Sequence, residues 1–454
     1  MNPFTQKSLW VLVIGGALLA NTGCKKDEDD AIVPDPTPAS NLITIDQPIS
    51  ASTEWTADHR YLIKGFVEVE AGATLTIAPG TVIFGDKTTK ETLIINRGAT
   101  INAAGTAADP IVFTSAEPAG SRAPGDWGGI ILCGRAPVNL PGGTGVVEGG
   151  VEAVFGGTDA ADNSGRLSFV RIEFPGIAFQ PNNEINGLTL AGVGSGTTID
   201  HIQVSYSGDD SYEWFGGAVN SKRVISFGGL DDDFDMDNGF SGKLQFGVAV
   251  RDANQADASG SNGLEHDNDA SGSTNSPFTT PIITNVSILG PLATSTSTPN
   301  DNYKRSAHLR RNTHTNVYNS VFAGFPTGLL IDGPGAEANA TNNDLVFRSS
   351  VIAGMTSNFA VASGSTWDIA TWFATNGWNN TTYTNNSDLL LAVPLDLNSP
   401  DLLPNEGSPL LSGADFTWSA LADGFFEQVS YRGAFGLEDW TSGWANWDPQ
   451  NTAY

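Results

Sequence analysis

Cysteine and positive charge are both scarce in this chain. Only Cys24 and Cys133 are present among 454 residues, and 22 lysines and arginines face 50 aspartates and glutamates, a formal net charge of −28. Two cysteines exclude a fold held together by many disulfides. A chain this acidic is repelled by the phosphate backbone, so we expect no nucleic acid partner. Long apolar segments are also rare, and the one at Leu9–Ala20 is too short to cross a membrane comfortably.

The N-terminus predicts export. Lys7 precedes the apolar run, and Asn21-Thr22-Gly23-Cys24 follows it. This order is typical of a signal peptide, and the last four residues resemble a lipobox, although Asn21 stands where leucine is usual. We therefore predict a lipoprotein signal peptide at 1–23 and a lipid on Cys24 that attaches the protein to a membrane. An ordinary secretory signal with an incidental cysteine is the alternative. A lipidated Cys24 would leave Cys133, within an apolar run, as a buried and inert thiol.

Residues 24–42 are expected to form an acidic and Pro-rich tether. Their first part, KKDEDD, is similar to the short charged tag that follows the lipidated cysteine in surface-exposed lipoproteins of Bacteroidetes. The resemblance implies an outer-membrane lipoprotein exposed at the cell surface. The alternative is a solvated linker that carries no targeting signal.

Internal repeats predict the fold of residues 43–355. GATLTI at Gly72 recurs as GATINA at Gly98, and NSVFAG at Asn319 recurs as SSVIAG at Ser349. Short runs rich in valine, isoleucine and phenylalanine lie between them, separated by glycine, asparagine and aspartate. Repeats of this length with short strands suit the coils of an all-β, right-handed parallel β-helix, in which stacked coils bury a continuous interior. An antiparallel sandwich or propeller explains the repeats less well.

Several longer motifs resemble one family of Bacteroidetes β-helix lipoproteins. They are LTIAPGTVIFG, PIVFTS with GDWGGIIL, YEWFGG, DDDFDMDNGF and the closing YRGAFGLEDWTSGWANWDPQN. The resemblance covers nearly the whole chain after the leader. It implies the fold and the cell-surface location, and it implies no activity, because none is settled for that family.

Tryptophan is concentrated in residues 356–454. Seven of the eleven tryptophans are there: Trp367, Trp372, Trp378, Trp418, Trp440, Trp444 and Trp447. We predict that this segment caps the open end of the β-helix and shields its last strand edge. A sugar-stacking surface is the alternative.

An acidic ladder is the strongest candidate site. Tyr212-Glu213-Trp214-Phe215, Phe234-Asp235-Met236-Asp237 and Leu264-Glu265-His266-Asp267 align on the coil repeat. Strand alternation then places His266 and all apolar side chains except Phe215 inside, and the carboxylates and Phe215 outside. The turns before the first two segments, Asp209-Asp210 and Asp231-Asp232-Asp233, are acidic too. Stacked carboxylates repel unless something neutralises them, and oxygen ligands without cysteine suit Ca²⁺. The predicted cation ligands are Glu213, Asp235, Asp237, Glu265 and Asp267. A solvated acidic face is the alternative.

In the next coil, the outward side chains are basic where those of the preceding coils are acidic. If Leu309 points inward, His308 and Arg310 point outward beside Arg311 and next to the acids. This rung either compensates neighbouring charge or binds an anionic ligand.

Three functions remain open from the sequence. The first is a surface protein that binds glycan on a cation-bearing face. The second is a Ca²⁺-dependent polysaccharide lyase with Arg310 or Arg311 as the base, which is demanding because arginine normally stays charged. The third is a structural or adhesive surface protein.

Overall fold

The computed structural model describes residues 41–180 and 183–454. The predicted signal peptide at 1–23, the lipidation site Cys24 and nearly all of the tether at 24–42 lie outside the described residues. Within the described part, no helix is both long enough and apolar enough to span a membrane.

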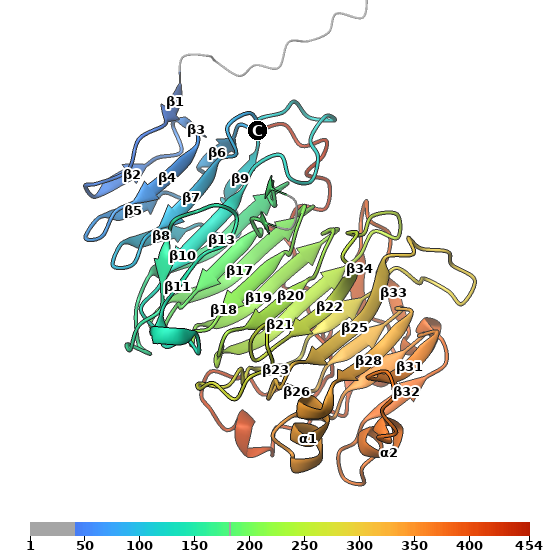
Figure 1. Ribbon diagram of the computed structural model, residues 1–454. Helices are drawn as coiled ribbons and strands as arrows, with labels where there is room; N and C mark the ends of the chain where they lie inside the picture. The colour runs from blue at the N-terminus through green and yellow to red at the C-terminus, as the bar shows by residue number, and fades with distance from the viewer. Residues whose placement is uncertain (1–40, 181–182) are drawn as a thin grey trace, which may run out of the picture. The chain divides into compact units, whose positions relative to one another are not determined.

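Parallel strands stacked coil upon coil make up the protein, which is an all-β parallel β-helix as predicted (Figure 1). One face of each coil contributes to a 10-stranded sheet in which every neighbouring pair is parallel. Its strands, in order, are β4 (Phe66–Val69), β7 (Thr92–Ile95), β10 (Gly129–Cys133), β16 (Leu188–Ala191), β18 (Tyr212–Phe215), β20 (Phe234–Asp237), β22 (Ser261–His266), β25 (Tyr303–Arg310), β28 (Thr327–Asp332) and β31 (Ser357–Val361).

The remaining faces of the coils form an 18-stranded sheet. Its strands are β1 (Leu42–Ile45), β2 (Thr53–Trp55), β3 (Arg60–Ile63), β5 (Thr74–Ile77), β6 (Val82–Gly85), β8 (Thr100–Ala104), β9 (Ile111–Ser115), β13 (Gly165–Glu173), β17 (Thr198–Ser205), β19 (Asn220–Phe227), β21 (Lys243–Val250), β23 (Ile282–Thr284), β24 (Ser287–Leu289), β26 (Asn316–Tyr318), β27 (Val321–Ala323), β29 (Val346–Arg348), β30 (Val351–Ala353) and β32 (Thr381–Tyr383).

Four long strands, β13, β17, β19 and β21, bend in the middle and so join two ladders into this one sheet. One residue at each bend has a left-handed backbone conformation: Phe169, His201, Arg223 and Phe246, with φ of 51°, 56°, 55° and 60°. Such φ values are uncommon for bulky residues. Here the bends stack, and the rings of Phe169 and His201 lie 4.3 Å apart.

Smaller elements project from the coils. The two-stranded sheets are β11 (Gly145–Val146) with β12 (Val154–Phe155), β14 (Ala178–Gln180) with β15 (Asn183–Glu184), and β33 (Leu391–Val393) with β34 (Asp401–Pro404). The helices are α1 (Pro334–Asn342) and α2 (Ile369–Phe373), with 3-10 turns at η1 (Pro141–Gly143), η2 (Asn386–Leu389), η3 (Pro409–Leu411) and η4 (Ser419–Leu421).

Apolar side chains from all faces fill the interior, and the largest buried cluster runs from Ile49 to Trp378. Cys133 lies in a second cluster under the outer loops. Burial raises the pKa of its thiol to about 12, so the thiol stays protonated and unreactive at neutral pH.

The coils continue past the boundary predicted at residue 355, because β31 pairs with β28 and β32 pairs with β30. The first part of the Trp-rich segment then covers the last coil. Trp372 and Trp378 belong to the main interior cluster, and Trp372 Nε1 donates to Ala340 O at 2.9 Å.

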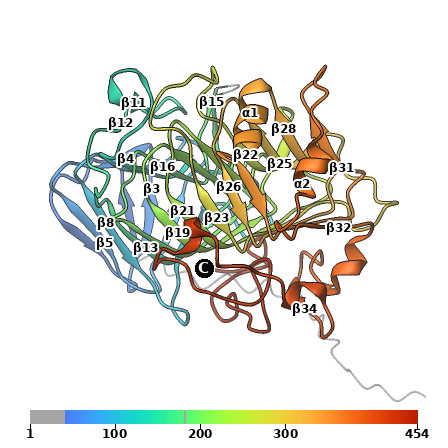
Figure 2. The same cartoon turned by 90° about the horizontal axis from the view of Figure 1, so that it is seen from below.

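The second part of that segment runs back along the outside of the 18-stranded sheet (red in Figure 2). Glutamine side chains of the sheet bind the backbone of this segment. Each side-chain amide donates one hydrogen bond to the segment and accepts one from it, as a neighbouring strand would. Gln203 pairs with Asn446 at 2.7 and 2.8 Å, and Gln245 pairs with Glu427 at 2.8 and 2.9 Å. Trp444 is buried in a further apolar cluster, so this tryptophan packs against the β-helix and leaves no face for a sugar.

Candidate functional site

The predicted ladder lies on adjacent rungs of the 10-stranded sheet. The observed register pairs Glu213 with Asp235, Asp235 with Glu265, and Glu265 with His308. In the preceding coil, Thr189 holds the position of Glu213. The register predicted from the sequence is therefore confirmed.

The inward columns are confirmed as well. Their side chains are fully buried: Tyr212, Phe234 and Leu264 in one column, and Trp214, Met236 and His266 in the other. His266 Nδ1 contacts Thr315 Oγ1 at 2.9 Å inside the coil. Burial lowers the pKa of His266 to about 3, so the ring is neutral and faces away from any ligand on the outer surface.

A second polar column lies beside the first, three residues earlier in each coil. Its members are Asn186, Asp210, Asp232 and Asn262. The amide of Asp232 donates to Asp210 Oδ1 at 2.8 Å, and the amide of Asn262 donates to Asp232 Oδ1. The acidic turns with Asp210 and Asp232 are visible in the sequence, but these residues are not among the predicted cation ligands. Their signal is the cluster of aspartates just before each of the first two ladder segments.

The two columns bring carboxylates within metal-binding distance of one another. Three groups have one oxygen per residue with all oxygens within 4.8 Å: Asp209, Asp210 and Asp231; Asp210, Glu213 and Asp235; and Asp232, Asp235 and Glu265. Of the predicted ligands, Glu213, Asp235 and Glu265 belong to these groups. Asp237 and Asp267 belong to none of the groups found among the described residues.

Asparagine amides flank the carboxylates at both ends. Asn186 Nδ2 donates to Glu213 Oε2 and, at 3.2 Å, to Glu148 Oε1. Asn262 Nδ2 donates to Glu265 Oε2 at 3.0 Å. Glu148 comes from the turn between β11 and β12, and its position could not be predicted because no repeat relates that loop to the coils.

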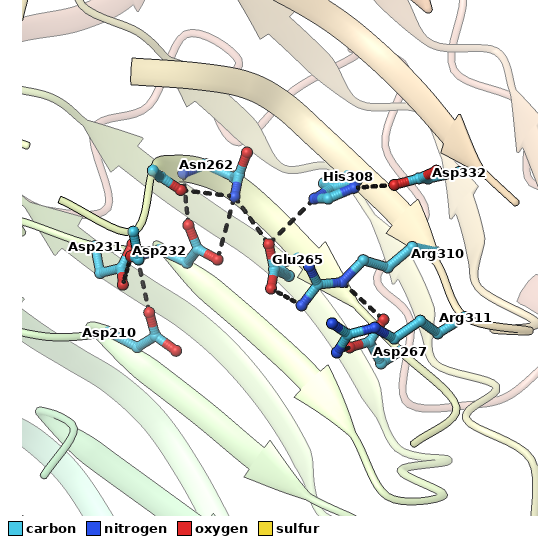
Figure 3. A network of polar contacts seen from close by, with 12 residues as sticks. Asp210, Asp231, Asp232, Asn262, Glu265, Asp267, His308, Arg310, Arg311 and Asp332 are labelled. Carbon is cyan, nitrogen blue, oxygen red and sulfur yellow. Dashed lines mark hydrogen bonds and ion pairs between the residues drawn. The ribbon is translucent and has the colours of Figure 1, made fainter. Parts of the chain in front are cut away.

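The basic rung contacts one end of the ladder (Figure 3). Arg310 forms ion pairs with Glu265 and, at 2.9 Å, with Asp267. Arg311 Nη1 lies 2.8 Å from Asp267 Oδ2. His308 bridges two acids, with Nδ1 3.1 Å from Glu265 and Nε2 3.0 Å from Asp332. Charge compensation between neighbouring coils is thus present at Glu265 and Asp267.

The two ends of the ladder differ electrostatically. Burial and then neighbouring carboxylates raise the pKa values of Asp210, Glu213, Asp232 and Asp235 well above their usual range. Burial also acts on Glu265, but His308 and Arg310 outweigh it and lower its pKa. The ladder therefore has an uncompensated half around Asp210 and Glu213 and a compensated half at the basic rung.

The uncompensated half fits a hard cation. Its donors are carboxylate oxygens gathered from neighbouring coils, which suits Ca²⁺ better than a thiophilic metal. The ion pairs that the basic rung makes among the described residues reach Glu265, Asp267 and Asp332 only. A divalent cation would neutralise charges that otherwise repel one another.

A cavity of about 400 Å³ lies beside the basic rung. Arg310, Arg311, Asp332 and the start of α1 line it, opposite the loop at Ser271 and Gly272. Burial opposes the charge on Arg310, but Glu265 and Asp267 outweigh it and raise the pKa of the guanidinium. Arg310 is therefore held as a cation, which suits binding of an anionic or hydroxyl-rich ligand better than proton abstraction.

Comparison with known proteins identifies the family of this architecture. No curated protein and no solved structure matched the chain. A family model described as a pectate-lyase like beta helix domain matches residues 47–392. That range contains the whole ladder, the basic rung and the cavity. The chain therefore belongs to the pectate-lyase like beta helix domain family.

Proposed function

We propose that this protein binds an acidic polysaccharide at the bacterial cell surface through divalent cations, Ca²⁺ first among them, held by the acidic ladder. The observation that carries the proposal is the set of three overlapping carboxylate groups centred on Asp210 and Asp235. Membership of a pectate-lyase like family is consistent with a function related to polysaccharides.

Cations explain how so acidic a face could bind an acidic glycan. Without them, the carboxylates of the ladder would repel the carboxylates of a uronate chain. A bound divalent cation reverses the local sign and has coordination positions left for a ligand oxygen. The neighbouring cavity with Arg310 and Arg311 then offers guanidinium donors for a second group of the same chain.

Binding is favoured over cleavage by the state of the arginines. A lyase needs a base near the sugar ring, and Arg310 is held charged by Glu265 and Asp267. Arg311 also pairs with Asp267. Cleavage is the second candidate, because the cavity places both arginines beside the cation ligands, and it is a possible outcome of the same experiment.

Calorimetric titration of the purified protein with Ca²⁺ tests the cation site. We expect saturable binding in the wild type and an affinity loss of about tenfold or more in Asp235→Asn, because Asp235 belongs to two of the three groups. Titration with polygalacturonate should show binding only in the presence of Ca²⁺. Unsaturated products, detected by their ultraviolet absorbance, would indicate a lyase.

Asp46→Asn is the matched control, because Asp46 is exposed on the turn after β1, far in sequence from the ladder. It should leave Ca²⁺ binding unchanged. Equal affinity in wild type and Asp235→Asn would contradict the cation site. Ca²⁺ binding without any response to acidic glycans would favour a structural or adhesive surface protein.

The location proposed with this function depends on Cys24. We expect the wild type to be retained in the outer membrane and Cys24→Ala to be released into a soluble fraction, because the lipid would be its attachment. Cell fractionation with immunoblotting measures this, and protease treatment of intact cells tests surface exposure separately. Cys133→Ala is the control, since its buried thiol should not affect location. Equal membrane retention of both variants would argue against a lipid on Cys24.

A further inference from the structure

Arg251 is a fully buried arginine against the turn that carries Asp231 and Asp232. It follows β21 at the corner of its coil, and its side chain has no exposed surface. The guanidinium pairs with Asp233 Oδ1 at 3.0 Å and lies 5.2 Å from the centre of the Tyr303 ring. A buried charge of this kind is costly unless it is paired and hydrogen-bonded.

Three hydrogen-bond acceptors of the Arg251 guanidinium belong to one turn of the neighbouring coil. Nη1 donates to Gly229 O at 3.2 Å as well as to Asp233, and Nη2 donates to Asp231 O. Ser226 Oγ also donates to Asp233 Oδ1, at 2.6 Å. The planar guanidinium therefore holds the turn between β19 and β20 at three points.

This turn carries carboxylates of the candidate cation groups. Asp231 and Asp232, which belong to different cation groups, lie between the points that Arg251 holds. The Asp232 amide contacts Asp210 of the preceding coil, and Asp232 Oδ1 accepts from the Asn262 amide of the next coil. Fixing the turn backbone thus sets the position of Asp232 relative to Asp210 in the preceding coil and to Asn262 in the next coil.

We propose that Arg251 is the positioning residue of the cation site: it holds the turn at Gly229–Asp233 so that the Asp231 and Asp232 carboxylates meet the ladder. This inference rests on the proposed function. Arg251 touches no ligand and acts through the backbone of the turn. Lysine retains the charge but has one donor nitrogen in place of the planar fork, so it cannot place donors at both the Nη1 and the Nη2 positions.

Arg251→Lys separates positioning from charge. We expect its Ca²⁺ affinity, measured by calorimetry below the melting temperature, to fall about tenfold. Hydrogen exchange of the Ca²⁺-free protein should become faster at residues 229–233. The matched control is Arg432→Lys, because Arg432 is also buried and donates to a backbone carbonyl, Pro409 O, in the returning C-terminal segment. It should leave both measurements unchanged.

The outcomes separate this inference from the proposed function. If Arg251→Lys keeps both the Ca²⁺ affinity of the wild type and its rate of hydrogen exchange at residues 229–233, the role of Arg251 is overturned. Faster hydrogen exchange at the turn in Arg251→Lys would show that Arg251 stabilises the turn. If the wild type then bound no Ca²⁺, the cation site would be overturned while this structural role of Arg251 remained. If Arg251→Lys does not fold, Ser226→Ala removes one bond to Asp233 and keeps the ion pair, and it should shift both measurements in the same direction by less. Unchanged values in Ser226→Ala would then overturn the inference.

Discussion

Phe234→Asp is expected to destabilise the protein severely, by more than about 4 kcal/mol. Phe234 has no exposed surface, and its ring lies 5.5 Å from that of Tyr212 inside the coil. Removing a buried phenylalanine side chain costs about 3–5 kcal/mol, and an unpaired carboxylate in its place adds a desolvation penalty. Circular dichroism with thermal unfolding measures the loss.

The adjacent residue provides the matched control. In Ca²⁺-free buffer at pH 8, Asp235→Asn should stabilise the protein by roughly 1–3 kcal/mol, because it removes a negative charge stacked between Glu213 and Glu265. Substitutions at these two neighbouring positions of one strand should therefore change the stability of the protein in opposite directions. Little or no loss of stability in Phe234→Asp would mean that the strand has its other face outward.

Ca²⁺ is expected to reverse the pH dependence of stability. The pKa values of Asp210, Glu213, Asp232 and Asp235 are raised in the folded state by burial and by one another. The folded protein therefore binds more protons than the unfolded chain above the ordinary carboxyl range, so the Ca²⁺-free protein should lose stability as pH rises above about 4. Ca²⁺ requires ionised carboxylates, and its stabilisation should grow over the same interval.

Melting temperatures from pH 4 to 8, with Ca²⁺ and with NaCl at equal ionic strength, measure this effect. At about 100 times its dissociation constant, Ca²⁺ adds about 2.7 kcal/mol, which means a rise of a few degrees for a domain of this size. NaCl screens the repulsion but has no specific site. Equal shifts with both salts, or a Ca²⁺-free protein that gains stability with pH, would contradict the prediction.

Much of the site was predictable because a β-helix repeats in one dimension. Each strand alternates sides, and each coil stacks on the last, so aligning YEWF with FDMD and LEHD predicted both the inward columns and the outward acids. The sign change at His308 and Arg310 followed from the same alignment, and the structure places both on the outer face beside Glu265.

Residues outside the repeat could not be placed in this way. Glu148 reaches Glu213 through Asn186 from a hairpin without a counterpart in other coils. Arg251 follows a strand of the 18-stranded sheet yet supports a turn that enters the other sheet. The C-terminal segment was expected to cap the end, but whether it would also run back along the sheet depended on contacts such as Gln245 with Glu427, which are 182 residues apart.

The sequence by itself determined the fold class, the register of the coils and which face carries the acids, because each depends on local alternation and on the spacing of repeats. Only the tertiary structure decided which acids gather within 4.8 Å, which of them Arg310 and His308 compensate, and which turn Arg251 holds. The physical reason is that strand period and coil length are local properties of the chain. The separation of two carboxylates, by contrast, depends on turns, loops and buried partners brought together from distant parts of the sequence.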